Sequence, residues 1–152
     1  MATISMRGLD EYIAKIEQLT VHSRGICKMS LWEGGKVVGD NIRSALNNIP
    51  EQDHYVPKGT MRKGLTKEQK SGVISGFGLA KMRQDGGSIS TKAGFHGSTD
   101  GKRNSALMRG VESGTSYMEK HPIVRPAINK SRSAAVSAIE AKFSEVIQNI
   151  MN

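Results

Sequence analysis

The side chains that most often perform catalysis or bind metals are scattered along this chain. Its four histidines, His22, His54, His96 and His121, lie beside no pair of acids that would complete a ligand set. The single cysteine, Cys27, cannot form an internal disulfide or a cysteine-based zinc site, and a buried structural role is expected for it. The usual hydrolase, phosphate-loop and metalloprotease motifs do not occur in the sequence. We therefore expect no enzymatic activity, no cofactor and no metal.

Positive charge is the second chemical feature of the sequence. The 22 Lys and Arg residues exceed the 14 Asp and Glu residues, which gives a net charge of +8. Such a surplus favours polyanionic partners or acidic protein surfaces, although a soluble protein with a basic surface would have the same composition. Phe77 and Phe95 are the one plausible pair of stacking platforms, and a core role is more typical of them. Sequence-specific nucleic-acid binding is therefore not expected.

The basic residues gather in two loops. Prolines and glycines interrupt any periodicity over residues 51–70, which indicates a long basic loop insertion. We expect this loop to contact a neighbouring subunit, or a partner such as a polyanion, through Lys58, Arg62, Lys63, Lys67 and Lys70. A solvated, partly disordered loop is the alternative interpretation. A second polar loop at 96–104 contains Lys102 and Arg103.

The segment from Gly110 to Ala127 has the most unusual spacing. Glu112 and Thr115 flank Gly114, a residue type that tolerates a positive φ. His121-Pro122 and Arg125-Pro126 then form two stiff dipeptides four residues apart. This context suits a bidentate pair between Arg125 and a carboxylate such as that of Glu112. An ordinary proline-stiffened entry into a last helix is the alternative interpretation.

The elements that position these residues follow from hydrophobic periodicity. Three- and four-residue spacing predicts helices over 8–20 and 23–48, with a bend or a close backbone approach at Gly34-Gly35. Alternation predicts an antiparallel hairpin between strands at 73–79 and 89–95. A short helix or bridge at 106–111 and a long helix at 131–151 follow, and the apolar stripe of the last helix should pack on the strands.

These elements predict a single α+β domain over residues 1–152. It should contain a small antiparallel sheet packed against two or three helices, including a long C-terminal helix, with long charged loops. The chain lacks an apolar run of about 20 residues, so no membrane contact is expected.

Residues 111–128 resemble a known family. The Glu-x-Gly-Thr-Ser … His-Pro-Ile-Val-Arg-Pro-Ala pattern before a long helix is similar to the head–tail joining proteins (neck or tail-completion proteins) of long-tailed bacteriophages. The opening Gly8-Leu9-Asp10-Glu11 helix and the helix that ends at Pro50 also fit. The chain departs from the family pattern at Ser113, where an aromatic is common, and over residues 51–70.

The resemblance implies a structural protein of the virion. It would form a homo-oligomeric ring, expected to be a hexamer, between the head connector or stopper and the tail tube or tail terminator. Genomic DNA would pass through this ring, and Lys102 and Arg103 would face the lumen. The alternative function is that of a small basic nucleic-acid-binding protein.

Overall fold

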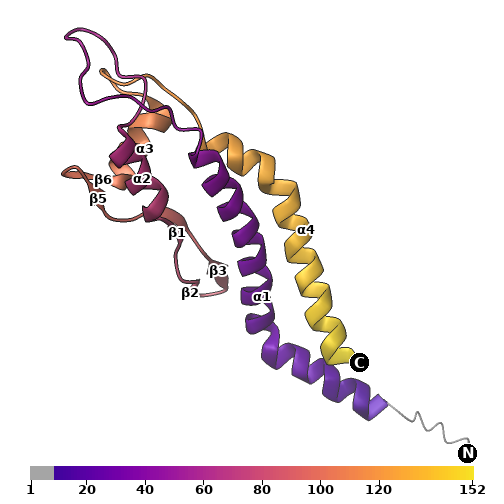
Figure 1. Cartoon of the computed structure of the whole chain (residues 1–152). Helices are drawn as coiled ribbons and strands as arrows, with labels where there is room; N and C mark the ends of the chain where they lie inside the picture. Colours follow the sequence, from indigo (N-terminus) through magenta and orange to yellow (C-terminus); the bar gives the residue numbers. More distant parts are fainter. Residues whose placement is uncertain (1–8) are drawn as a thin grey trace, which may run out of the picture.

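The computed structural model describes residues 9–152 and confirms an α+β fold (Figure 1). Gly8, the first residue of the opening helix expected from sequence, lies outside the described residues. The described helices are α1 (Leu9–Leu46), α2 (Lys67–Gly76), α3 (Asn104–Ser113) and α4 (Val124–Met151). The strands form three separate two-stranded antiparallel sheets, so the strand content is more divided than the one small sheet expected. They are β1 (Phe77–Leu79), β2 (Arg83–Asp85), β3 (Ser88–Ser90), β4 (Ala93–Phe95), β5 (Ser98–Thr99) and β6 (Lys102–Arg103).

Helices α1 and α4 run antiparallel along the long axis of the molecule (Figure 1). The two helices expected at 8–20 and 23–48 are one 38-residue helix, so the expected break between them is wrong. Near its start the Nζ of Lys15 donates a hydrogen bond of 2.6 Å to the carbonyl of Met151. A close approach occurs at Gly34, where an added Cβ would lie 2.5 Å from Cγ1 of Ile139. Gly34 therefore lets α4 pack directly on the α1 backbone.

The last helix begins at Val124, seven residues before the expected start at 131. Its Pro126 lies in the first turn, where a missing N–H costs no helical hydrogen bond. The helix packs mainly on α1, which corrects the expectation that its stripe would cover the strands. Helix α1 is long enough to face nearly all of α4, whereas each strand has only two or three residues.

The predicted strand at 73–79 is wrong over residues 73–76, which belong to α2. The side chain of Thr66 accepts from the Gln69 N–H, and the side chain of Gln69 accepts from the Thr66 N–H, so a capping box starts this helix. The hairpin expected beyond it is confirmed, because β1 pairs with β4 and sets Phe77 opposite Phe95. Their ring centroids lie 5.3 Å apart, which confirms the core role of this pair.

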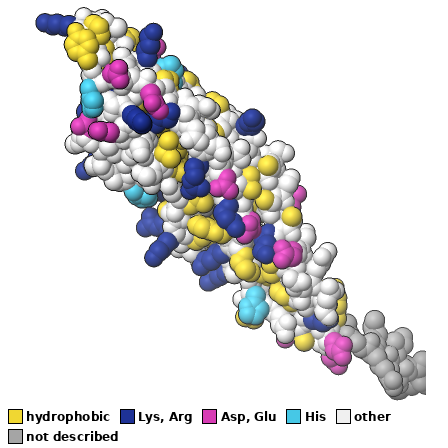
Figure 2. All heavy atoms as spheres, viewed as in Figure 1, with side chains coloured by type: hydrophobic (Ala, Val, Ile, Leu, Met, Phe, Trp, Pro, Cys, Tyr) yellow, Lys and Arg dark blue, Asp and Glu magenta, His cyan; other side chains and the backbone are white. Residues whose placement is uncertain are grey.

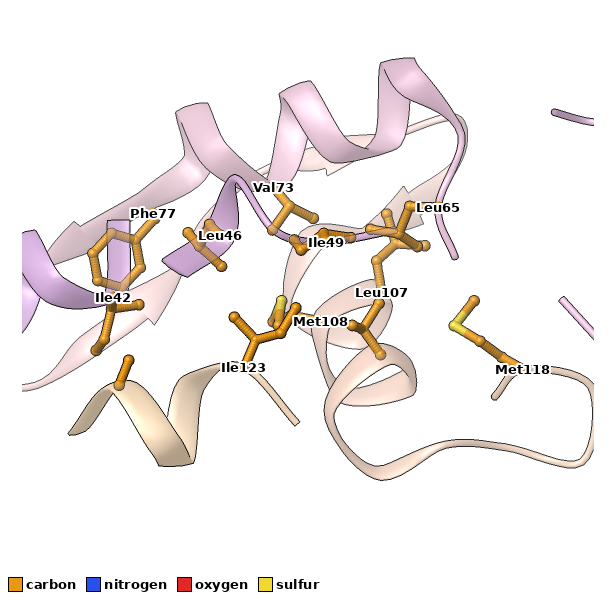
Figure 3. Close-up of a cluster of buried hydrophobic side chains, with 12 residues drawn as sticks. Ile42, Leu46, Ile49, Leu65, Val73, Phe77, Leu107, Met108, Met118 and Ile123 are labelled. Carbon is orange, nitrogen blue, oxygen red and sulfur yellow. The ribbon is translucent and has the colours of Figure 1, made fainter. Parts of the chain in front are cut away.

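The hydrophobic core lies at one end of the α1–α4 pair, between the end of α1, helices α2 and α3, and the start of α4 (Figure 3). Its twelve buried residues are Ile42, Leu46, Ile49, Leu65, Val73, Phe77, Leu107, Met108, Val111, Met118, Ile123 and Ala127. The α1–α4 pair extends beyond this core as a two-helix arm, which we define as residues 9–33 of α1 and 135–151 of α4. Cys27 is exposed on the arm, so the buried role expected for it is wrong.

None of the described helices is long and apolar enough to cross a membrane.

Candidate functional site

Glu112 joins the end of α3 to the start of α4. Its Oε2 accepts the N–H groups of Ile123 at 2.7 Å and Val124 at 2.9 Å. Its Oε1 accepts the N–H of Arg125 at 2.9 Å. Helix α4 has no side-chain cap from its own N-cap residue, Ile123. The carboxylate of Glu112 therefore caps α4 from a different element.

The residue types around this cap account for every N–H group at the start of α4. The first N–H groups of a helix have no partner inside the helix. Glu112 accepts the first three, and Pro126, which follows, has no N–H to satisfy. The next residue, Ala127, donates to the Ile123 carbonyl at 3.3 Å and starts the helical pattern. The acid and the proline of this motif thus leave no N–H group without a partner in the first turn of α4.

The Glu112 carboxylate that caps α4 is held in its charged form. Partial burial alone would raise the pKa of Glu112, but the three backbone hydrogen bonds and the nearby charge of Arg125 outweigh it and lower the pKa below its ordinary value. The positive end of the α4 dipole also favours a negative charge at this place. Glu112 is therefore an anion at neutral pH with a structural task.

Residues 114–122 form a short loop between α3 and α4, here called the motif loop. Gly114 has a φ of 74°, and a Cβ there would lie 3.1 Å from Cβ of Lys120. The Thr115 N–H donates to the Met118 carbonyl at 2.9 Å, which closes a turn. The His121 N–H donates to the Val111 carbonyl at 2.7 Å and ties the loop back to α3. Pro122, exposed, follows and leads into the buried Ile123.

The side-chain pair expected between Arg125 and Glu112 is not formed. The Arg125 side chain is exposed, and no ion pair or hydrogen bond links it to another described residue. The bond between the two residues runs through the Arg125 backbone, because the carboxylate already sits against the N-terminal turn of α4. The arginine side chain consequently points into solvent near the motif loop.

The basic loop expected at 51–70 packs against the motif loop. The Arg62 N–H donates to the Tyr117 carbonyl, and the Glu119 N–H donates to the Arg62 carbonyl, each at 2.8 Å. Two backbone hydrogen bonds join the ends of the basic loop. The Gln52 N–H donates to the Leu65 carbonyl at 2.8 Å, and the Leu65 N–H donates to the Pro50 carbonyl at 2.9 Å. The two loops therefore form one body at the end of the molecule opposite the arm (Figure 1).

Only three of the five basic residues expected in this loop lie in it. Lys67 and Lys70 belong to the first turns of α2, which corrects the loop boundary expected at residue 70. Lys70 pairs with Glu51 at 3.0 Å within the subunit. Lys58 and Lys63 are exposed, whereas Arg62 is half-buried. Lys58 and Lys63 are thus the lysines of the loop that remain open to a partner.

Hydrophobic side chains lie beside Lys and Arg side chains at the end of the molecule opposite the arm (Figure 2). Tyr55 is 82% exposed and Tyr117 is 65% exposed, and they come from the basic loop and the motif loop respectively. We call this surface the tip, defined as Tyr55, Lys58, Met61, Lys63 and Tyr117. Tyrosine and methionine are enriched at protein interfaces. The tip therefore has the composition of a protein-docking surface.

Lys102 and Arg103 are exposed on β6, as a DNA-facing role requires. They follow a tight turn in which Asp100 and Gly101 both have positive φ, of 55° and 72°. Arg103 also lines an open cavity of about 460 Å³ together with Arg109 of α3, which the sequence had not singled out. The sequence signal for Arg109 was weak because only the turns of α3 bring it to Arg103. Serine and threonine hydroxyls line the same cavity, and no acid does.

The Glu112 cap and the bonds between the motif loop and the basic loop hold α3, α4 and the two loops together. Within residues 9–152 no group of three or more His, Cys, Asp or Glu side chains could hold a metal ion. Comparisons with protein-family models, with curated proteins and with solved structures found no match to this chain.

Proposed function

We propose that this chain is a structural component of a bacteriophage neck or tail-completion ring. In this proposal it forms a homo-oligomer, expected to be a hexamer, that joins the head connector to the tail tube in the virion and lets DNA pass. The observation that supports it most is the cap of α4 by Glu112. The residues that resemble the phage family are those that make this cap and its loop. A motif whose residues cap a helix and join two elements has a structural role, which fits a protein that acts by assembling into a particle.

The tip supplies the contact with the adjoining ring in this proposal. Its lysines, Lys58 and Lys63, have no ion-pair partner among the described residues, and exposed tyrosines flank them. Positive charge together with exposed aromatic side chains favours an acidic protein surface that carries apolar pockets. Electrostatic attraction would guide the approach, and the tyrosines would give most of the affinity.

The test is the particle made when the tip is altered. Phage carrying Lys58→Glu with Lys63→Glu should give full heads and free tails side by side in negative-stain images, because joining fails. Lys92→Glu, an exposed reversal outside the tip, is the control and should give joined particles. Normal infectious particles from the tip variant would remove the tip from the proposal. Absence of the wild-type chain from purified virions would end the proposal itself.

DNA binding is the alternative function, and the cavity between Arg103 and Arg109 favours it. Two arginines, together with serine and threonine residues and two glycines, can bind a phosphate group of a nucleic-acid backbone through charge and hydrogen bonds. Fluorescence anisotropy with duplex DNA across a salt series measures this. A nucleic-acid-binding protein should show micromolar or tighter affinity, with log K falling by about 0.9 per phosphate contact for each unit of log salt. A neck protein needs no measurable affinity at physiological salt.

A further inference from the structure

The two-helix arm leaves many large apolar side chains uncovered. Two helices bury one seam between them, which here contains Ile26, Ser30 and Ala135. Outside the seam, eight large apolar residues remain from 37% to 76% exposed. They are Tyr12, Ile13, Ile16, Val21, Met29, Trp32, Val136 and Phe143. Figure 2 shows hydrophobic side chains recurring along the visible face of these helices, between charged ones.

On α1 these residues form two separate faces. Ile13 and Ile16 share one side of the helix with the exposed Cys27, and we call this face A. Val21, Met29 and Trp32 share another side, and we call this face B. At 100° per residue the centres of the two faces lie about 150° apart around the helix axis. The arm therefore offers two different apolar surfaces.

Face B continues a stripe that the hairpin covers higher up the helix. Leu79 and Thr91 pack on α1 at Gly35, and Leu79 also packs on Gly39. Below Gly35 the hairpin no longer packs on this side of α1; Val21 and Met29 there line an open groove together with Val146 and Ile150 of α4, and Val21 and Trp32 remain exposed. The covered part shows that this side of α1 accepts a packed apolar neighbour.

The exposed apolar area can be compared with what an interface between copies needs. At about 200 Å² for a large side chain, the five residues Ile13, Ile16, Val21, Met29 and Trp32 of faces A and B expose on the order of 500 Å² of apolar surface. The other three exposed residues of the arm, Tyr12, Val136 and Phe143, raise the sum to on the order of 800 Å². Since interfaces are roughly 57–65% apolar, faces A and B alone correspond to about 750–900 Å² of total buried surface, and all eight residues to about 1,200–1,400 Å². The contact therefore reaches the standard class of specific interfaces when it also covers Tyr12, Val136 and Phe143.

The charge of the arm also suits a second copy better than a polyanion. Its described sequence ranges contain 4 Lys or Arg and 6 Asp or Glu residues, so the arm has a net charge of −2 while the chain has +8. The basic surplus therefore lies entirely outside the arm. Mixed charges of both signs produce no strong one-signed field to repel a copy of the same arm.

We infer that copies of this chain associate through their arms, with face A of one copy packed against face B of the next. Contacts between two different surfaces are head-to-tail, and such contacts form a ring when the rotation closes. This inference rests on the proposed function, because it names the surface that joins neighbouring subunits in that ring. Each subunit then covers both of its apolar faces.

The first test measures the mass of the full chain and of two variants by sedimentation. Ile16→Glu places a charge in face A, and Val21→Glu places one in face B. Each should convert the wild-type oligomer into a monomer with unchanged helical circular dichroism. Ile128→Glu is the matched control, because it changes an exposed apolar residue of α4 that lies outside both the arm and the tip, and it should leave the oligomer intact.

Mixing the two variants separates a head-to-tail contact from a symmetric one. The Ile16→Glu chain keeps face B intact, and the Val21→Glu chain keeps face A intact. A 1:1 mixture should therefore form heterodimers and nothing larger. A contact between identical faces would make the variant that keeps this face pair with itself, and a mixture that stays monomeric would show that faces A and B do not bind each other; either result overturns the inference.

The native Cys27 of face A provides a second measure of assembly, because its thiol is exposed in the single chain. Its alkylation by iodoacetamide should be about tenfold slower in the wild-type oligomer than in the Val21→Glu monomer, because assembly covers the thiol. Equal rates, a monomeric wild type or variants that keep the wild-type mass would each overturn the inference. If the variants show that the arms join the subunits but the wild-type chain is absent from purified virions, the proposed function is overturned and the inference about the arms stands.

Discussion

Replacing Glu112 with alanine removes the acceptor of three backbone N–H groups at once. The carboxylate holds the N–H groups of Ile123, Val124 and Arg125 at 2.7 to 2.9 Å. Water can replace it only partly, because Ile123 is buried in the core. The first turn of α4 would then be left without its cap, and the connection from α3 to α4 would be lost.

The size of the effect follows from the groups involved. Loss of a helix cap costs about 0.5–2 kcal/mol. The interaction of an anion with the helix dipole adds about 0.3–1 kcal/mol. One buried N–H left unsatisfied costs roughly 1–3 kcal/mol. Because this cost and the loss of the cap describe partly the same hydrogen bonds, they do not add in full, and the expected loss for Glu112→Ala is about 2–4 kcal/mol. For a chain of this size each kcal/mol lowers Tm by about 2–4 °C, so Tm should fall by roughly 5–15 °C.

Urea and thermal unfolding followed by circular dichroism measure this loss. Glu140→Ala is the control, because Glu140 is an exposed acid of α4 with no ion pair to another described residue, and its change should stay within about 0.5 kcal/mol. Glu112→Gln keeps the shape but removes the charge, so it should fall between the wild type and the alanine variant.

The pH dependence provides the refutation. The pKa of Glu112 is lower in the folded chain than its ordinary value of 4.5. The stability that the charge contributes is therefore complete above pH 4.5 and is lost as the pH falls through the lower, folded pKa. The advantage of the wild type over Glu112→Gln should shrink over that range and stay constant above it. An unchanged unfolding midpoint for Glu112→Ala at pH 7 would refute the capping role.

Three further changes test other parts of the fold. Arg125→Ala should change the free energy of unfolding by no more than about 0.5 kcal/mol, since the side chain is exposed, and a larger loss in urea titration would indicate a missed partner. Gly64→Ala should cost about 1–3 kcal/mol, because a Cβ there would collide with the Pro50 carbonyl; Gly87→Ala, where nothing lies within 4 Å, is its control. Deleting residues 58–69 should prevent folding, because it removes a fully buried leucine and the capping box of α2. A cooperative thermal transition in the deletion variant would contradict this.

Local patterns in the sequence were sufficient for several elements. The short helix expected at 106–111 is present as α3, and the pairing of Phe77 with Phe95 is present in β1 and β4. The error at 73–76 arose because alternating residues there fit both periods, since Gln69, Val73 and Phe77 are also spaced four apart. The capping box of Thr66 and Gln69 was the signal that would have favoured a helix.

The candidate site was only half predictable. The sequence singled out Glu112, Gly114 and Pro126, and all three have structural tasks. It assigned Glu112 to the wrong group, the Arg125 guanidinium, because side-chain pairing is the usual reason for an acid and an arginine in one motif. The distance of eleven to thirteen residues between the acid and its backbone donors has no local periodic signature.

By itself, the sequence determined the α+β class, the long C-terminal helix, the position of the unusual motif and the excess of positive charge. These properties depend on residue types and on periods of two to four residues. Only the tertiary structure decided that the basic loop docks on the motif loop, that Cys27 is exposed, and that α4 packs along α1 and leaves a two-helix arm. Such features depend on which distant segments meet and on what area remains uncovered afterwards. Neither quantity is encoded in the spacing of neighbouring residues, because burial is a property of the whole packed chain.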